Sequence, residues 1–163
     1  MTTENKKFFG LLAILLIIVG ILIFFISRNS KEIRTEMDNL SPTQIVEKIE
    51  NGEKIVLYIG SETCSYCKEL LPILHKAQTN LNFTTVYLNL GKVNLEEYQK
   101  LSPYLDKVLT ANVNGESKTQ EMGKFFVTPM VAVINDGKMI DGFIGGISYR
   151  EYTNFLKDSG ISK

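Results

Sequence analysis

The longest uninterrupted apolar stretch of the chain lies near its start. Residues 8–26 carry no charge and are flanked by lysine on one side and arginine on the other. At about 1.5 Å per residue, a helix of this length would reach roughly 28 Å, close to the hydrocarbon thickness of a bilayer. A cleavable signal peptide is the alternative, but its apolar region is shorter and ends at a small-x-small site. The pattern predicts a single transmembrane anchor at residues 8–26 behind a short tail, residues 1–7.

Polar residues 27–40 come next without a sustained apolar face, and they predict a linker to a folded domain at residues 41–163. The domain begins with clear helix signals. Ser41 is a natural N-cap, Pro42 suits the first helical position, and Gln44 completes a capping box. The apolar face after this box predicts a helix that ends at the next glycine.

Two β-branched, apolar runs, residues 54–59 and 83–90, are typical of strands buried on both faces. The amphipathic residues 64–79 between them predict a helix, so strand, helix and strand form a βαβ unit with a right-handed crossover. Residues 95–109 have apolar side chains at helical spacing and predict further helix, in which Pro103 must start a new turn or interrupt it. The polar residues 111–123 predict a loop.

A hairpin is predicted where Asp136-Gly137 separates two apolar runs, residues 130–134 and 138–144. A Ser-x-x-Glu capping box at Ser148 then begins the last helix. The order β-α-β, helix, β-β-α indicates an α/β domain with a mixed central sheet and helices on both of its faces.

Charge and cysteine usage bear on partners and location. The 163 residues contain 18 Lys plus Arg and 18 Asp plus Glu, so the net charge gives no support for nucleic acid as a partner. Lys and Arg counts slightly favour a cytoplasmic domain, whereas a very short tail before a first apolar segment is usual for an anchor that exports the domain behind it. Two cysteines in one motif suit an oxidising compartment. We therefore expect a single-pass protein of the cell membrane with an extracytoplasmic domain.

Both cysteines, Cys64 and Cys67, lie in one C-x-x-C unit between a predicted strand and a predicted helix. A helix start favours a thiolate, and a second cysteine one turn on can attack a mixed disulfide formed by the first. The alternatives are an inert structural disulfide and a zinc site. Structural zinc needs four ligands, and His75 is the single histidine, so we expect no metal and assign His75 to the surface or to helix packing. The sequence has no Gly-rich phosphate loop and no C-x-x-C-H motif, so it gives no support for a nucleotide or haem cofactor. We expect no cofactor besides a redox-active disulfide between Cys64 and Cys67.

The domain resembles the thioredoxin superfamily over roughly residues 41–160. Four features in the family's order carry the resemblance: the C-x-x-C unit, Pro72 in the same helix, Thr128-Pro129 before the hairpin, and Gly145-Gly146 before the last helix. The stretch LYIGSETC at residues 57–64 is similar to small thioredoxin-like proteins of Gram-positive bacteria, including bacteriocin transport accessory proteins. The resemblance implies a thioredoxin-like fold.

It also implies roles for individual residues. Cys64 corresponds to the exposed nucleophile and Cys67 to the buried resolving cysteine. A cis peptide bond is expected before Pro129, where the backbone of Thr128 can present its N–H and C=O groups to an extended substrate segment. The substrate-binding residues expected from the resemblance are Ser65, Tyr66, Thr128, Pro129 and Gly146.

Departures from the family's pattern leave the direction of electron transfer open. Thr63 stands where thioredoxins carry Trp, and Tyr58 stands where a buried carboxylate relays protons, although a phenol is a poor base at neutral pH. Ser65-Tyr66 matches neither the Gly-Pro of reductants nor the Pro-His of strong oxidants. Residues 95–123 exceed what a minimal thioredoxin needs, and we expect this insertion to cap the groove or to bind a partner.

Two functions are compatible with these observations. The first is a membrane-tethered thiol-disulfide oxidoreductase that exchanges disulfides with exported protein or peptide substrates, for which a membrane redox partner would complete the cycle. A variant of it keeps the domain in the cytoplasm as a reductase. The second is a non-catalytic accessory or binding subunit of a secretion or bacteriocin export system, in which the disulfide only braces the helix.

Overall fold

The computed structural model describes residues 15–24 and 37–161. Residues 15–24 form a helix whose apolar side chains are exposed, among them Leu16 and Ile23. The ends predicted for the anchor, residues 8 and 26, lie outside the described residues. Within the two described ranges, no helix combines the length and the apolar character that crossing a membrane requires.

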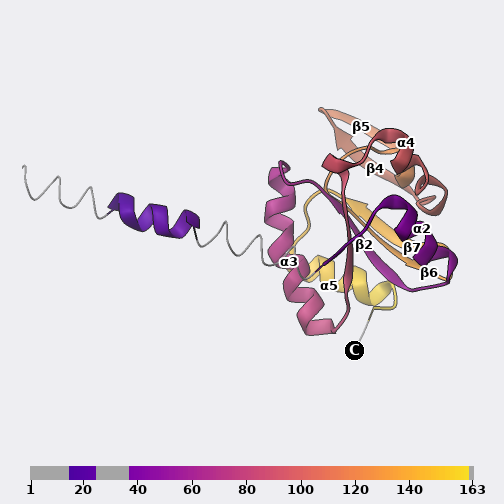
Figure 1. Cartoon of the computed structure of the whole chain (residues 1–163), viewed down its shortest axis with the longest axis horizontal. Helices are drawn as coiled ribbons and strands as arrows, with labels where there is room; N and C mark the ends of the chain where they lie inside the picture. The colour runs from indigo at the N-terminus through magenta and orange to yellow at the C-terminus, as the bar shows by residue number, and fades with distance from the viewer. Residues whose placement is uncertain (1–14, 25–36, 162–163) are drawn as a thin grey trace, which may run out of the picture.

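A mixed sheet forms the centre of the domain, with its strands in the order β1-β3-β2-β6-β7 (Figure 1). Strands β1 and β2 run parallel to β3, whereas β6 is antiparallel to β2 and β7 is antiparallel to β6. This is the predicted mixed α/β arrangement. The bounds of these strands are Asp38–Asn39 for β1, Ile55–Gly60 for β2, Thr85–Asn89 for β3, Met130–Asn135 for β6 and Lys138–Ile144 for β7.

Helices cover both faces of this sheet. Successive side chains of a strand point to opposite faces, so a strand that is apolar throughout must be covered on both sides. Val56, Tyr58 and Val131 face α3 and α5, whereas Leu57 and Ala132 belong to the core on the side of α2 and α4. The helices are α2 (Pro42–Glu50), α3 (Ser65–Leu81), α4 (Leu95–Gln99) and α5 (Tyr149–Asp158), and the 3-10 turns are η1 (Leu90–Lys92), η2 (Ser102–Tyr104) and η3 (Met122–Lys124).

The predicted helix starts and turns are largely confirmed. The Gln44 backbone N–H donates to Ser41 Oγ at 3.3 Å while the Ser41 N–H donates to Gln44 Oε1 at 2.9 Å, which completes the capping box of α2. Ser148 caps α5 in the same way. The two buried strands, the cysteine helix, the C-terminal hairpin and the last helix end within two residues of their predicted bounds.

The helix predicted at residues 95–109 is wrong beyond Gln99. Helix α4 stops there, and Pro103 lies inside the separate turn η2, which confirms the interruption expected at this proline. Residues 108–113 form a strand, β4 (Val108–Val113), where the helix was predicted to continue. Proline removes a backbone donor and disfavours a helical residue before it, so the apolar spacing could not be continued as one helix. The apolar side chains Leu101 and Leu105 are buried all the same.

The loop predicted at residues 111–123 is also wrong, because β4 and β5 (Glu116–Glu121) form an antiparallel hairpin. Asn114 and Gly115 lie at its turn with φ of +55° and +86°. A two-residue type I′ turn needs positive φ at both central residues, and Asn-Gly supplies them most easily. The hairpin is separate from the central sheet and lies beside α4 in Figure 1.

The linker predicted at residues 27–40 overlaps the first strand. Met37 is buried, and Asp38 and Asn39 of β1 pair in parallel with Val86 and Tyr87 of β3. Two residues of strand give too short a pattern to stand out from a polar sequence. Residues 27–36 of the predicted linker lie outside the described residues.

Candidate active site

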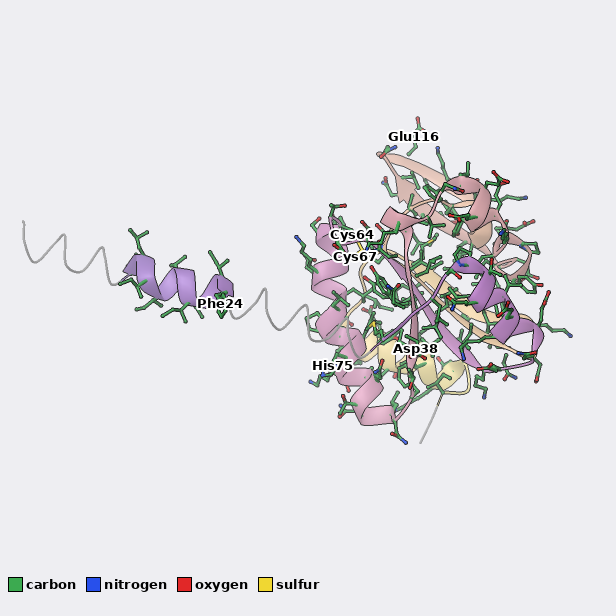
Figure 2. The ribbon with its side chains drawn as sticks, in the orientation of Figure 1. Phe24, Asp38, Cys64, Cys67, His75 and Glu116 are labelled. Atoms are coloured by element: carbon green, nitrogen blue, oxygen red, sulfur yellow. A yellow bond between two sulfur atoms is a disulfide. The ribbon has the colours of Figure 1, made fainter. Side chains whose placement is uncertain are left out.

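The two cysteines form a disulfide at the start of α3. Cys64 is the N-cap of this helix, and the Cys67 backbone N–H donates to Cys64 Sγ at 3.1 Å. Cys64 is half-buried, whereas Cys67 is completely buried among side chains of the core under α3 and α5. Solvent therefore reaches Cys64 and not Cys67. Figure 2 shows the yellow disulfide at one end of α3 and His75 farther along the same helix.

This position favours negative charge on the first sulfur once the disulfide is reduced. Helix α3 is 17 residues long, and its N-terminal N–H groups carry the positive end of the helix dipole. A hydrogen bond to a thiolate is stronger than one to a neutral acceptor, so the Cys67 N–H stabilises the charged form of Cys64. The arrangement can therefore supply an accessible sulfur nucleophile with a second sulfur one turn away.

A network of polar side chains holds the loop that leads into the helix. Ser61 Oγ lies 3.1 Å from Thr63 Oγ1, and the Cys64 N–H donates to the Ser61 carbonyl oxygen at 3.4 Å. Across the loop, Asn89 Nδ2 donates to Glu62 Oε1 at 3.2 Å. The loop between Gly60 and Cys64 is thus fixed both by its own hydroxyl groups and by the neighbouring strand.

Asn89 and Lys92 belong to this network, and the sequence did not predict either of them. Asn89 is buried at the end of β3, where it pairs with Gly60 of β2, and its Oδ1 accepts the Gly91 N–H at 3.1 Å. Lys92 Nζ lies 3.7 Å from the same Glu62 carboxylate oxygen. The sequence offered one signal for Asn89, an amide residue at the end of an apolar, buried strand. The carboxyl ends of adjacent parallel strands lie at the same edge of a sheet, so this amide was placed to reach the loop that follows β2.

The second predicted segment lies next to the disulfide loop. The Thr128-Pro129 peptide bond is cis, as expected from the resemblance, and Pro129 is buried while Thr128 is half-buried. Met130, the next residue, pairs with Ile59 of β2, so Pro129 lies at the end of the sheet where the Ser61–Cys64 loop begins. The cis bond and the disulfide therefore share one edge of the fold.

A third segment reaches the same edge. The Gly145 N–H donates to the Pro129 carbonyl oxygen at 2.9 Å, and Gly145 has φ of +98°, which glycine adopts without strain. Gly146 is exposed, and a Cβ placed on it would meet no atom within 4 Å. Of the residues between the cysteines, Ser65 is exposed and Tyr66 keeps 62% of its surface in solvent. The predicted site residues thus lie on three converging segments.

Beneath the site, the position of the expected carboxylate is aromatic. Tyr58 is buried in the same core as Cys67, and its ring stacks on Tyr87 with centroids 5.3 Å apart. No Asp or Glu is buried in residues 37–161. His75 is half-buried on α3, and the described parts of the chain contain no group of three or more His, Cys, Asp or Glu side chains arranged to hold a metal ion.

No protein-family model matches the chain. Among solved structures, it is similar to thioredoxin f2 of Chlamydomonas reinhardtii, with a TM-score of 0.55 and 15% identity over 78% of this chain and 99% of that one. It is also similar to oxidized mitochondrial thioredoxin 3 of Saccharomyces cerevisiae, with a TM-score of 0.53 and 17% identity over 76% of this chain and 96% of that one. A thioredoxin of Aeropyrum pernix gives a TM-score of 0.50 and 15% identity over 73% and 83% of the two chains.

The chain has a thioredoxin-like fold. At these identities the comparisons establish the architecture alone, and the architecture is the one that the four sequence features implied. The thioredoxin-like domain combines this fold with a disulfide at C-x-x-C spacing on the edge described above. That combination is the starting point for a functional assignment.

Proposed function

We propose that this protein is a membrane-tethered thiol-disulfide oxidoreductase that exchanges disulfides with exported protein or peptide substrates through Cys64 and Cys67. One observation carries the proposal. The Cys64–Cys67 disulfide lies at the start of α3, where the Cys67 N–H donates a hydrogen bond to the accessible Cys64 Sγ, at the edge that also holds the cis Thr128-Pro129 bond. A disulfide that only braced a helix would need neither accessibility nor an anion-stabilising donor.

The exchange balances within the two cysteines and the substrate. In the reducing direction, the Cys64 thiolate attacks one sulfur of a substrate disulfide, and the other substrate sulfur leaves and takes up a proton. The Cys67 thiolate then attacks Cys64 Sγ, which forms the intramolecular disulfide and releases the second substrate thiol. Two electrons pass from the cysteine pair to the substrate, and oxidation of a substrate dithiol follows the same steps in reverse.

The backbone beside the disulfide suits an extended substrate. The Thr128 backbone precedes the cis bond and can offer its N–H and C=O groups to a peptide strand. Ser65, Tyr66 and Gly146 leave open surface around the sulfur pair. Because the nucleophile is reached from solvent and no enclosed pocket is needed, a polypeptide is a more suitable substrate than a small metabolite.

Tethering to a membrane is part of the proposal because of the apolar N-terminal stretch. The described part of that stretch, residues 15–24, is a helix with exposed apolar side chains, which water solvates poorly. A tether raises the effective concentration of the domain near chains that emerge from a membrane. We place the domain outside the cytoplasm, where a membrane redox partner would reset the cysteine pair.

Cysteine variants distinguish catalysis from a purely binding role. Cys64→Ser should abolish turnover of a disulfide substrate, and Cys67→Ser should accumulate a mixed disulfide between Cys64 and the substrate. Ser117→Ala, on the exposed face of β5, is the matched control and should keep full turnover. If both cysteine variants retained the partner and the cellular phenotype of the wild-type protein, the protein would be a non-catalytic accessory subunit instead.

Two further measurements address direction and location. A reduction potential near about −270 mV would assign a reductant, and one near about −120 mV would assign an oxidant. A membrane-impermeant thiol reagent applied to intact, mildly reduced cells should label Cys64. Labelling that appeared only after lysis would contradict export and favour a cytoplasmic reductase.

A further inference from the structure

Two exposed aromatic side chains belong to the segments that build the active-site edge. Tyr66 lies between the cysteines with 62% of its surface exposed, and Phe126 lies three residues before Pro129 with 44% exposed. Phe126 lies two residues before Thr128, so its backbone is at most about 7 Å from the backbone beside the cis bond. Phe126 belongs to no feature on which the thioredoxin resemblance rests.

The Phe126 ring is held in a fixed position. It packs edge-on against Tyr98 with ring centroids 5.4 Å apart and an angle of 73° between the planes. Tyr98 is 1% exposed and comes from α4, in the segment predicted from the sequence to be an insertion. The preceding residue, Phe125, is buried, and its N–H donates to the Met122 carbonyl oxygen at 3.0 Å. Tyr98 therefore supports one side of the Phe126 ring, while 44% of the surface of Phe126 stays exposed.

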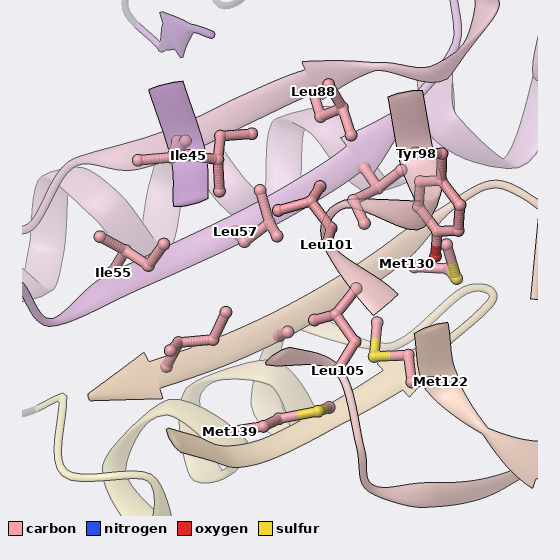
Figure 3. Close-up of a cluster of buried hydrophobic side chains, with 14 of the residues drawn as sticks. Ile45, Ile55, Leu57, Leu88, Tyr98, Leu101, Leu105, Met122, Met130 and Met139 are labelled. Carbon is pink, nitrogen blue, oxygen red and sulfur yellow. The ribbon is translucent and has the colours of Figure 1, made fainter. Parts of the chain in front are cut away.

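Tyr98 ties this ring to the cis-proline edge. Tyr98 and Met130 belong to the same buried cluster, and Figure 3 shows the hydroxyl end of Tyr98 directed toward Met130, the residue after Pro129. The Tyr98 hydroxyl has no hydrogen-bond partner among the described residues. Its contribution here is thus the packing of its ring and not a polar contact.

We propose that Phe126, positioned by Tyr98, is a specificity-determining residue that binds a large apolar side chain close to the cysteine of an extended polypeptide substrate. This inference rests on the proposed function and names its substrate class. An extended chain advances about 3.3 Å per residue, so a substrate that passes the cis bond would bring a side chain within about three residues of its cysteine to Phe126. Lys124 Nζ and Glu121 Oε2, on the same segment, lie 3.3 Å apart, so the two charges offset each other and the segment offers an apolar contact at Phe126.

The position of Phe126 also indicates that the substrate segment that covers it is unfolded. Phe126 lies on the segment that leads into the cis Thr128-Pro129 bond, so a polypeptide that reached Cys64 past this bond could also cover Phe126. Cysteine and the large apolar residues are among the residue types most often buried in folded proteins, so an unfolded segment is the form in which both are accessible together. The insertion would therefore select substrates by supporting Phe126, without contacting the substrate itself.

Matched peptides test the inference on the full-length protein. Each pair of peptides holds one intramolecular disulfide and differs only in Phe or Ser at one of the three positions before or after the attacked cysteine. We expect kcat/KM of the wild-type protein to favour Phe about tenfold at one or two of these positions, which is part of the gain from burying an aromatic side chain. Phe126→Ala should reduce this preference to about twofold or less, mainly through KM, and Phe126→Leu should retain most of it.

Positioning by Tyr98 is tested separately. Tyr98→Phe keeps the ring and removes only an unpaired hydroxyl, so the preference for Phe should stay unchanged, whereas Tyr98→Leu should lower it while the protein remains folded by circular dichroism. Ile140→Ala removes an exposed apolar side chain from β7 and is the control that should keep the full preference.

The outcomes separate this inference from the proposed function. If the wild-type protein turned over none of the peptides and no small disulfide such as glutathione disulfide, the proposed function itself would fail. Turnover without any preference for Phe, or with a preference that survived Phe126→Ala, would overturn the inference alone. Concentration-dependent dimerisation that Phe126→Ala abolished would also overturn it, by assigning the patch to a second copy of the chain.

Discussion

Two hairpins of this domain begin from the same local signal and end in different surroundings. Asp136-Gly137 turns β6 into β7 with φ of +48° and +74°, and Asn114-Gly115 turns β4 into β5 with φ of +55° and +86°. Strand β6 lies inside the central sheet with residues 130–134 buried. In the hairpin of β4 and β5, by contrast, Ala111 is the single buried residue.

The difference shows that turn chemistry determines how the chain reverses, while neighbouring elements determine how much the resulting hairpin stabilises the fold. The hairpin of β6 and β7 is flanked by Pro129 and Gly145, and so it also positions the active-site edge. The hairpin of β4 and β5 carries none of the predicted site residues. Variants on the two hairpins should therefore differ in both stability and activity.

The largest difference is expected for a charge placed in each hairpin. Ala132→Asp puts a carboxylate at a completely buried position of β6, within a cluster of apolar side chains, and should cost about 4 kcal/mol or more of unfolding free energy. Ser117→Asp on the exposed face of β5 should change it by less than about 0.5 kcal/mol and leave disulfide turnover intact. Urea unfolding and a turnover assay measure both effects. Equal losses would mean that β5 is covered in the folded protein.

A second comparison uses the turn glycines. Gly137→Ala and Gly115→Ala each force a Cβ into positive φ, at a cost of about 1–2 kcal/mol, and neither Cβ would meet an atom closer than 4.0 Å. The backbone strain is therefore similar in the two variants, and they differ in the hairpin that carries the substitution. Gly137→Ala should lower the global unfolding free energy by that amount.

Gly115→Ala should act locally, because the hairpin of β4 and β5 has few buried contacts and can open without unfolding the domain. Amide hydrogen exchange should accelerate in residues 108–121 while the urea midpoint changes little. A full loss of global stability in Gly115→Ala would show that this hairpin unfolds together with the core.

The same contrast explains which elements could be predicted from the sequence. Buried strands such as residues 55–60 are continuous apolar runs, and helices such as α5 begin at a recognisable N-cap, here Ser148. Both kinds of element can therefore be predicted from the sequence. Strand β5 reads ESKTQE, and its polar residues hid an Asn-Gly signal as strong as the Asp-Gly signal that predicts the other hairpin. An exposed two-stranded hairpin has little apolar periodicity, so the turn must be given more weight than the strands.

The residues of the candidate site also differ in how well the sequence predicts them. The Cys64–Cys67 disulfide could be predicted from two cysteines three positions apart, and the cis bond before Pro129 was expected from the family resemblance. For Asn89 the sequence offered only an amide at the end of a buried strand, because its role depends on its pairing with Gly60 across the sheet, and this register is a tertiary property. Phe126 could not be predicted, since the sequence does not show which of two adjacent phenylalanines is exposed.

A smaller effect is expected from the helix that covers β6 and β7. Phe143 of β7 packs against Phe155 of α5 with ring centroids 5.1 Å apart, and no helix plays this role on the exposed face of β5. Ser148→Ala removes the N-cap of α5 and should cost about 1 kcal/mol at pH 7. Thermal unfolding at several pH values measures it.

This cost should depend on pH. Hydrogen bonds from the Ser148 hydroxyl and backbone N–H lower the pKa of Glu151 below its ordinary value. A lowered folded pKa stabilises the protein above the unfolded pKa, and the stabilisation is lost as pH falls through the folded pKa. Wild-type and Ser148→Ala proteins should therefore differ more at pH 7 than near pH 3. A difference that stayed constant across this range would assign the whole effect to the uncharged part of the cap.

The smallest effect is expected from charge pairing on the exposed hairpin. Lys118 Nζ lies 3.9 Å from Glu116 Oε2, and both side chains are largely in solvent, so the attraction is screened and the side chains lose rotamer freedom when they pair. Lys118→Ala should change hydrogen-exchange protection of β4 and β5 by less than about 0.5 kcal/mol and should become silent at 1 M salt, where the screening length falls to about 3 Å. A larger, salt-sensitive loss would mean that side-chain charges, and not the Asn114-Gly115 turn, hold this hairpin closed. The contrast with the hairpin of β6 and β7 would then rest on electrostatics as well as on burial.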